Sequence, residues 1–162
     1  MNLGRFLRGA LAFTMLIVLQ YSVRPLLGWR INADFLVIGV LLMAVRMRPG
    51  QAAILGFLTG LISDSPVPDA FGAGALAMTL IAFAASWLKA VFFADNVVLH
   101  AFFFLVGKWA FDIVYALAEH RLTVSEMVVQ LLLWSPLAGA ATALAGVLLL
   151  LLFRSALEPR TA

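Results

Sequence analysis

Apolar residues run along almost the whole chain and are interrupted only by short polar segments. Hydrophobic residues make up 64% of the 162 residues and charged residues 12%, about half the charged fraction of a soluble domain. A soluble fold of this length could not hide so much apolar surface, so we expect lipid to be the solvent. Because no polar segment is long enough to fold alone, the sequence predicts a single transmembrane domain over residues 1–162.

The polar breaks divide this sequence into six apolar segments, which predict an all-α compact bundle of six transmembrane helices. The first segment follows two arginines, as in a signal peptide, but no small-residue cleavage site comes after it, so we interpret it as a retained helix. The segments are approximately 6–23, 34–45, 51–62, 70–88, 97–118 and 125–153.

The second and third segments are short for membrane spans. Twelve residues of helix rise only about 18 Å, whereas the hydrocarbon core is about 30 Å thick. They are either short or tilted spans inside the bundle, or a re-entrant hairpin with Arg46 and Arg48 at its tip. A charge at membrane depth costs at least about 2.5–3.5 kcal/mol, so we favour two spans that deliver these arginines to the cytoplasm.

The distribution of basic residues predicts the orientation of the chain. Cytoplasmic loops of membrane proteins carry an excess of Lys and Arg, which favours cytoplasmic N- and C-termini in a multi-pass membrane protein. The charges are scattered without a basic run, so the expected surroundings are membrane lipid and not nucleic acid. In this orientation Arg5, Arg8, Arg46, Arg48, Lys89, Arg154 and Arg160 lie inside, and Arg24, Arg30 and Arg121 lie outside.

The third segment carries a glycine pair followed by a carboxylate. Gly56 and Gly60 are four residues apart on one helix face, where they let another backbone approach closely. We expect intramolecular packing here, with contact to a partner subunit as the alternative. Asp64 lies one turn further on, and Gly72 lies in the first turn of the next helix. A capping role suits the acidic residues better than ion coordination, and Asp69 is expected at the positive end of the fourth helix.

Four polar residues fall on one face of the fifth segment. Lys108, Asp112, Tyr115 and Glu119 occur at i, i+4, i+7 and i+11. Lys108 is near the middle of a span and must find a partner or water, and Asp112 is one turn away. The stripe is either a functional site or an ion pair that neutralises charge and orients the helix, and the sequence leaves both interpretations open.

Few other residues suggest chemistry. The chain has no cysteine, and its two histidines are 20 residues apart. No nucleophile–base pair, phosphate-binding loop or metal-ligand cluster is visible, so we predict no catalytic residue, cofactor or metal and no enzyme activity. Pro136 removes a backbone hydrogen bond from the sixth segment and predicts a kink that shapes the bundle.

Taken in order, these features resemble the MreD family of rod shape-determining proteins. In that family a Pro-Asp pair opens an apolar helix, an Arg-Pro turn follows, and a G-F-x-x-G-x-x-x-D stretch leads through a loop to a glycine. Pro136 matches a proline that is frequent in the last helix, while Ala141 replaces a polar residue that commonly follows it. The matching segments are Ala33-Asp34-Phe35-Leu36-Val37, with Ala33 in place of the usual proline, Arg46-Met47-Arg48-Pro49, residues 56–64, and Gly72.

The resemblance implies a non-enzymatic scaffold of the bacterial elongasome, located in the inner (cytoplasmic) membrane. MreD-like proteins bind MreC, a single-span periplasmic scaffold. With MreC they act on the RodA glycosyltransferase and its penicillin-binding transpeptidase, alongside MreB filaments, in peptidoglycan synthesis and rod cell shape. The family's bundle also resembles the substrate-binding subunit of energy-coupling-factor transporters. That likeness supplies an alternative, a vitamin-like small-molecule binding subunit of a transporter, in which the Lys108–Asp112 stripe lines a polar cavity.

Overall fold

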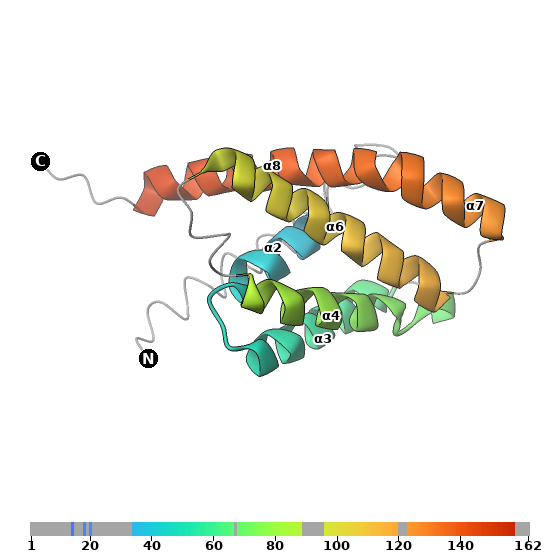
Figure 1. Ribbon diagram of the computed structural model, residues 1–162. Coiled ribbons are helices and arrows are strands. Elements are labelled where there is room, and N and C mark those ends of the chain that lie inside the picture. The colour runs from blue at the N-terminus through green and yellow to red at the C-terminus, as the bar shows by residue number, and fades with distance from the viewer. Residues whose placement is uncertain are drawn as a thin grey trace, which may run out of the picture.

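The computed structural model describes residues 34–66, 68–88, 96–119 and 123–157, together with Thr14, Val18 and Gln20, which are helical. All regular structure in these ranges is helical (Figure 1). The predicted first helix, 6–23, and the connection that follows it lie outside the described residues apart from those three positions. The other five predicted segments can be compared with the structure, and each contains a helix.

The helix boundaries follow the predicted segments to within a few residues. The long C-terminal helix is interrupted by a π-helical turn, η2 (Gln130–Trp134), and a short 3₁₀ turn, η1 (Pro68–Ala70), precedes α4. The helices are α2 (Phe35–Ala44), α3 (Pro49–Asp64), α4 (Ala73–Trp87), α6 (Val97–Glu119), α7 (Val124–Val129) and α8 (Ser135–Leu157).

Local sequence signals account for most of the helix starts. Asp34 caps α2, because its Oδ1 accepts a hydrogen bond of 3.2 Å from the backbone N–H of Val37. Pro49 is the first residue of α3, a position where the missing N–H of proline removes no intrahelical hydrogen bond. Asn96 Oδ1 accepts from the backbone N–H of Val98 at 2.9 Å, so Asn96 caps α6.

The C-terminal helix starts slightly earlier than its sequence suggested. It begins at Val124, one residue before the predicted Ser125, and Thr123 is its N-cap, where the Glu126 carboxylate accepts from the backbone N–H of Thr123 at 3.0 Å. This is one half of a capping box, in which a glutamate at the third helical position satisfies the donor of the cap residue.

Helix α2 lies at the centre of the described bundle. Helices α3 and α4 pack together on one side of it, and α6 and α8 pack together on the other (Figure 1). Eight of the ten residues of α2 are buried, which explains why its sequence is apolar on every face. Its length is about 15 Å and that of α3 about 24 Å, so both fall short of a hydrocarbon core of about 30 Å.

The outer helices present apolar side chains to their surroundings. Trp87 on α4, Val98 on α6 and Leu144 on α8 are all exposed. The helices Val97–Glu119 and Ser125–Leu151 are each long and apolar enough to cross a membrane. Such an extensive apolar surface is the one expected of a protein surrounded by lipid.

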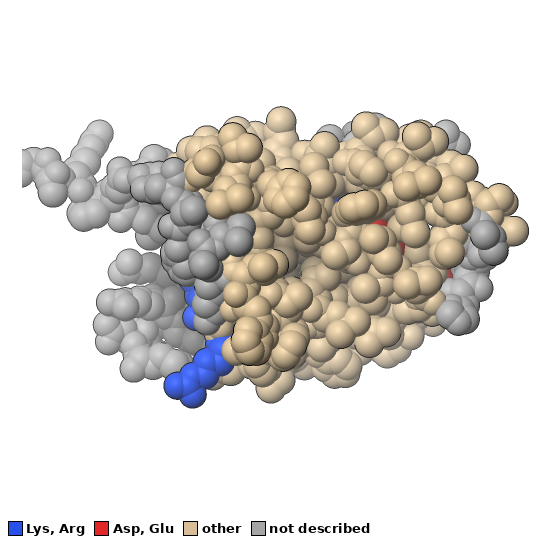
Figure 2. All heavy atoms as spheres, in the orientation of Figure 1, with Lys and Arg blue, Asp and Glu red and all other residues tan. Residues whose placement is uncertain are grey.

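Exposed positive charge gathers at one end of the bundle. Figure 2 shows Lys and Arg atoms at that end of the visible face, while the rest of the described surface on this face is almost uncharged. Arg46 and Arg48 are both exposed and lie in the turn between α2 and α3. A turn between two apolar helices is where charged groups are expected in a protein surrounded by lipid.

Candidate functional site

The two glycines of α3 lie directly against α4. A methyl group added at Gly56 would overlap the carbonyl oxygen of Met78, and one added at Gly60 would overlap the Cα of Ala75. Both obstacles are backbone atoms, which cannot move aside as a side chain can. The glycine face of α3 is therefore occupied by α4 of the same chain, the packing arrangement that the spacing of small residues favours.

A buried carboxylate joins the end of α3 to the beginning of α4. Asp64 is only 4% exposed, and its Oδ2 accepts from the backbone N–H groups of Gly72 at 2.9 Å and Ala75 at 3.0 Å. Gly72 has φ of 99°, a left-handed conformation that glycine adopts without strain. Gly74 is also needed, because a methyl group there would overlap Asp64 Oδ1.

This arrangement corrects the predicted start of the fourth helix. The sequence placed that start near Ala70 and assigned the carboxylate at its positive end to Asp69. The helix instead begins at Ala73, with Gly72 as the cap residue, and Asp69 lies in the 3₁₀ turn. Asp64 supplies the acceptor from the preceding helix, where it satisfies otherwise unpaired N–H groups and meets the positive end of the α4 dipole.

An ion-pair network lies between α2 and α6. Lys108 Nζ is 2.7 Å from Asp112 Oδ1 and 3.3 Å from Asp34 Oδ2. The side chains of Lys108, Asp34 and Asp112 are only 9%, 15% and 16% exposed. The predicted contact between Lys108 and Asp112 is thus present, and Asp34 joins it from α2, 74 positions earlier in the chain.

Two hydroxyl groups extend this network to α8. Ser135 Oγ donates to Asp112 Oδ2 at 2.7 Å, and Thr142 Oγ1 accepts from the backbone N–H of Asp34 at 3.1 Å. Both hydroxyl-bearing residues are fully buried. Helices α2, α6 and α8 are therefore tied together by polar contacts at one place, which we call the three-helix network (Asp34, Lys108, Asp112, Ser135 and Thr142).

The π-helical turn before Pro136 is compensated by a tryptophan of α6. In this turn the backbone N–H of Ser135 donates to the carbonyl of Gln130, five residues back. The next bond of that pattern would join residue 136 to Leu131, but proline has no N–H to donate. Trp109 Nε1 donates to the Leu131 carbonyl instead, at 3.0 Å, so the freed carbonyl is satisfied within the protein as a lipid environment requires.

Some of the residues that build these contacts belong to the family motif. Asp34 belongs to the motif's opening pair, and Gly56, Gly60, Asp64 and Gly72 form the α3–α4 contact described above. The family model for rod shape-determining protein MreD matches residues 1–155. The chain belongs to the MreD family. No curated protein and no solved structure matches it.

Membership of the MreD family establishes the broad role of the chain. It is a membrane protein of rod shape determination, in agreement with the two helices of its described part that are long and apolar enough to cross a membrane. No group of three or more His, Cys, Asp or Glu residues able to hold a metal ion occurs within the described part of this MreD-family chain.

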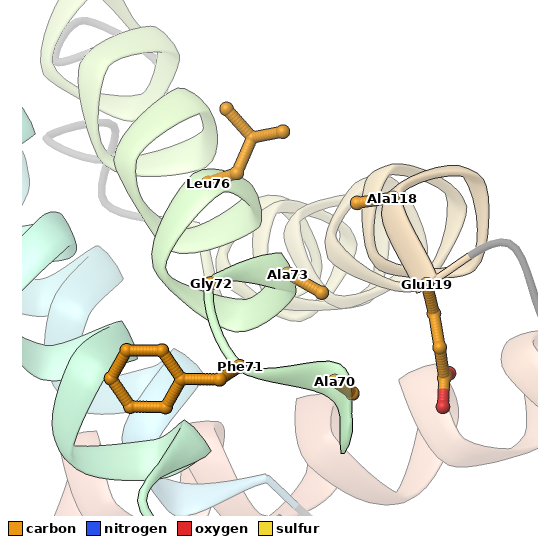
Figure 3. A pocket seen from close by; sticks show the side chains of 7 residues that line it. All are labelled: Ala70, Phe71, Gly72, Ala73, Leu76, Ala118 and Glu119. Carbon is orange, nitrogen blue, oxygen red and sulfur yellow. The ribbon is translucent and has the colours of Figure 1, made fainter. Parts of the chain in front are cut away.

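The four residues of the predicted polar stripe do not form one site. Lys108 and Asp112 belong to the three-helix network, whereas Tyr115 stacks on the ring of Phe111, with centroids 5.7 Å apart. Glu119 is the last residue of α6 and lines a separate cavity next to the start of α4 (Figure 3). Eleven residues of helix separate Lys108 from Glu119 by about 16 Å along the axis, too far for a shared contact.

The hydrogen bonding of the three-helix network favours a structural role. Asp34 accepts from Val37 and Lys108 through its two oxygens, and Asp112 accepts from Lys108 and Ser135 through its two. Every carboxylate oxygen thus already has a donor from the protein. Lys108 Nζ also lies 4.7 Å from the centre of the Phe111 ring, a favourable cation–π distance. A ligand would have to displace contacts that the fold itself uses.

Proposed function

We propose that this MreD-family chain is a non-enzymatic scaffold of the elongasome that binds MreC. Through MreC it would support the RodA glycosyltransferase and its penicillin-binding transpeptidase, alongside MreB, during peptidoglycan synthesis. The match to the MreD family over residues 1–155 carries this proposal. It is supported by the three-helix network, in which each carboxylate oxygen accepts a hydrogen bond from the protein, as in a contact that holds helices together.

The proposal includes a topology. We take the complete bundle to have six helices, with an arrangement like that of the substrate-binding subunit of energy-coupling-factor transporters, and to have both termini in the cytoplasm. The exposed Arg46 and Arg48 in the α2–α3 turn support a cytoplasmic position for that turn. In this topology the ends of α3 and α6 and the start of α4 face the outside. They can therefore contact a periplasmic scaffold.

The transporter alternative finds less support in the described residues. Binding sites for small molecules usually have volumes of about 300–1,000 Å³ and enclose most of the ligand. One cavity of about 280 Å³ lies between α4 and α6, and a groove of about 430 Å³ follows α7 and η2 on the outside of the bundle. Neither is lined by Lys108 or Asp112, the pair on which the alternative depended.

The direct test is recovery of partners from membranes. The tagged protein is extracted in mild detergent and the bound proteins are identified by mass spectrometry, with an unrelated multi-pass protein of the same membrane as control. Recovery of the cognate MreC is expected. Recovery of a transporter ATPase module without MreC would contradict the scaffold role and favour the alternative.

A further inference from the structure

A small cavity opens where the end of α6 meets the start of α4. Its volume is about 280 Å³. Figure 3 shows Ala73 of α4 and Ala118 of α6 on its walls, with the Glu119 side chain extending from the end of α6 beside the Ala70–Gly72 backbone. The ring of Phe71 points to the other side of that backbone. The cavity, which we call the slot, is an open pocket with alanine methyl groups on its walls, a carboxylate at its edge and a lining that is more polar than apolar.

The groups around this slot attract positive charge. Glu119 is the last residue of α6, where the final carbonyl groups of a helix lack intrahelical partners and the helix dipole is negative. A carboxylate is unfavourable at such an end unless a cation accompanies it. Within the described residues Glu119 forms no ion pair, and a cation beside it would stabilise a carboxylate at this end of the helix.

We propose that this slot receives a lysine or arginine side chain of the extracytoplasmic partner. The inference rests on the proposed binding of MreC and on the proposed topology. Lysine and arginine combine an aliphatic stem with a charged head. The stem can pack against the alanine side chains, and the head can pair with the Glu119 carboxylate. The volume is slightly below that of ordinary small-molecule sites, which also favours a single side chain.

A lipid headgroup fits the same slot less well. Phosphatidylethanolamine carries a primary ammonium, but its phosphate would lie close to the Glu119 carboxylate and to the carbonyl end of α6. The neighbouring N-terminus of α4 offers little compensation, because Asp64 already accepts from the N–H groups of Gly72 and Ala75 there. A basic side chain brings the positive charge without the adjacent negative one.

The test compares the affinity of the purified MreC partner for three forms of the full chain in lipid nanodiscs. Glu119→Gln removes the charge but keeps the shape, and we expect the dissociation constant to rise about tenfold. Glu126→Gln is the matched control, since Glu126 is an exposed glutamate of α7, and its dissociation constant should stay within about twofold of wild type. Carbodiimide coupling then identifies which amine lies beside Glu119.

The outcomes separate this inference from the proposed function. Unchanged affinity in Glu119→Gln, with normal binding by the wild type, would overturn the inference and leave the scaffold role intact. An equal loss of affinity in both variants would indicate general charge attraction and would also overturn the inference. Coupling of Glu119 to phosphatidylethanolamine with unchanged partner affinity would assign the slot to lipid. Failure of the wild type to bind would overturn the proposed function itself.

Discussion

Removal of Lys108 should destabilise the protein strongly, because it leaves two carboxylates without their shared cation. Lys108 is 9% exposed and contacts both Asp34 and Asp112. Breaking a buried ion pair by removing one partner costs about 3–5 kcal/mol. We therefore expect Lys108→Met to lower the free energy of unfolding by about 4 kcal/mol. With roughly 2–4 °C per kcal/mol for a chain of this length, the melting temperature should fall by about 8–16 °C.

A triple variant should restore most of this stability. When Lys108→Met is combined with Asp34→Asn and Asp112→Asn, no uncompensated charge remains, and replacing a whole buried ion network by neutral residues is often neutral or stabilising. Asparagine is a good N-cap residue, so position 34 can still cap α2, and the amide oxygen introduced at position 112 can still accept from Ser135. We expect the triple variant to lie within about 1 kcal/mol of wild type.

Thermal unfolding in detergent, followed by near-ultraviolet circular dichroism, measures these differences. Arg48→Met is the matched control, because Arg48 is an exposed basic residue of the α2–α3 turn, and a surface substitution changes stability by less than about 0.5 kcal/mol. The reasoning would be refuted if Lys108→Met melted like wild type. It would also be refuted if the triple variant were as unstable as the single one, since the loss would then not be electrostatic.

Three further variants probe the other contacts, each by the same melting measurement. Gly60→Ala forces a methyl group into the α4 backbone and should lower the free energy of unfolding by about 3 kcal/mol. Gly50→Ala is the control, because nothing lies within 4 Å of a methyl group added there, and it should be neutral or slightly stabilising. Equal effects of the two substitutions would contradict the close contact between α3 and α4. Asp64→Ala leaves two N–H groups without acceptors and should cost about 3 kcal/mol; a change below about 1 kcal/mol would be contrary to its capping role. Trp109→Phe should lower the free energy of unfolding by about 1–3 kcal/mol. The loss should be smaller in a Pro136→Ala background, where alanine supplies the missing N–H. Additive effects of the two substitutions would argue against the compensation of Pro136 by Trp109.

Features set by local spacing could be predicted from the sequence. The contact between Lys108 and Asp112 follows from a separation of one helical turn, and the cap at Asn96 follows from a polar residue just ahead of an apolar run. The close packing of α3 through Gly56 and Gly60 was likewise expected from their spacing. Each of these depends on residues within one or two turns of one another.

Features that depend on tertiary contacts were not found in the sequence. Asp34 joins Lys108 from 74 positions away, and no local pattern specifies that pairing. Asp64 accepts from the first turn of α4 across a loop, a contact that only the folded chain makes possible. The π-helical turn and the role of Trp109 were also missed, since Pro136 indicates an irregularity but not which residue compensates for it.

The central claim is that this MreD-family chain is a scaffold for MreC and that its three-helix network serves the fold and not ligand binding. The most direct measurement is the affinity of the cognate MreC for the wild type and for the triple variant at positions 34, 108 and 112, in nanodiscs. We predict the same dissociation constant for both within about threefold, because neither carboxylate is available to a partner. Absence of binding by the wild type would contradict the scaffold role. Loss of binding by a folded triple variant would contradict the structural role of the network.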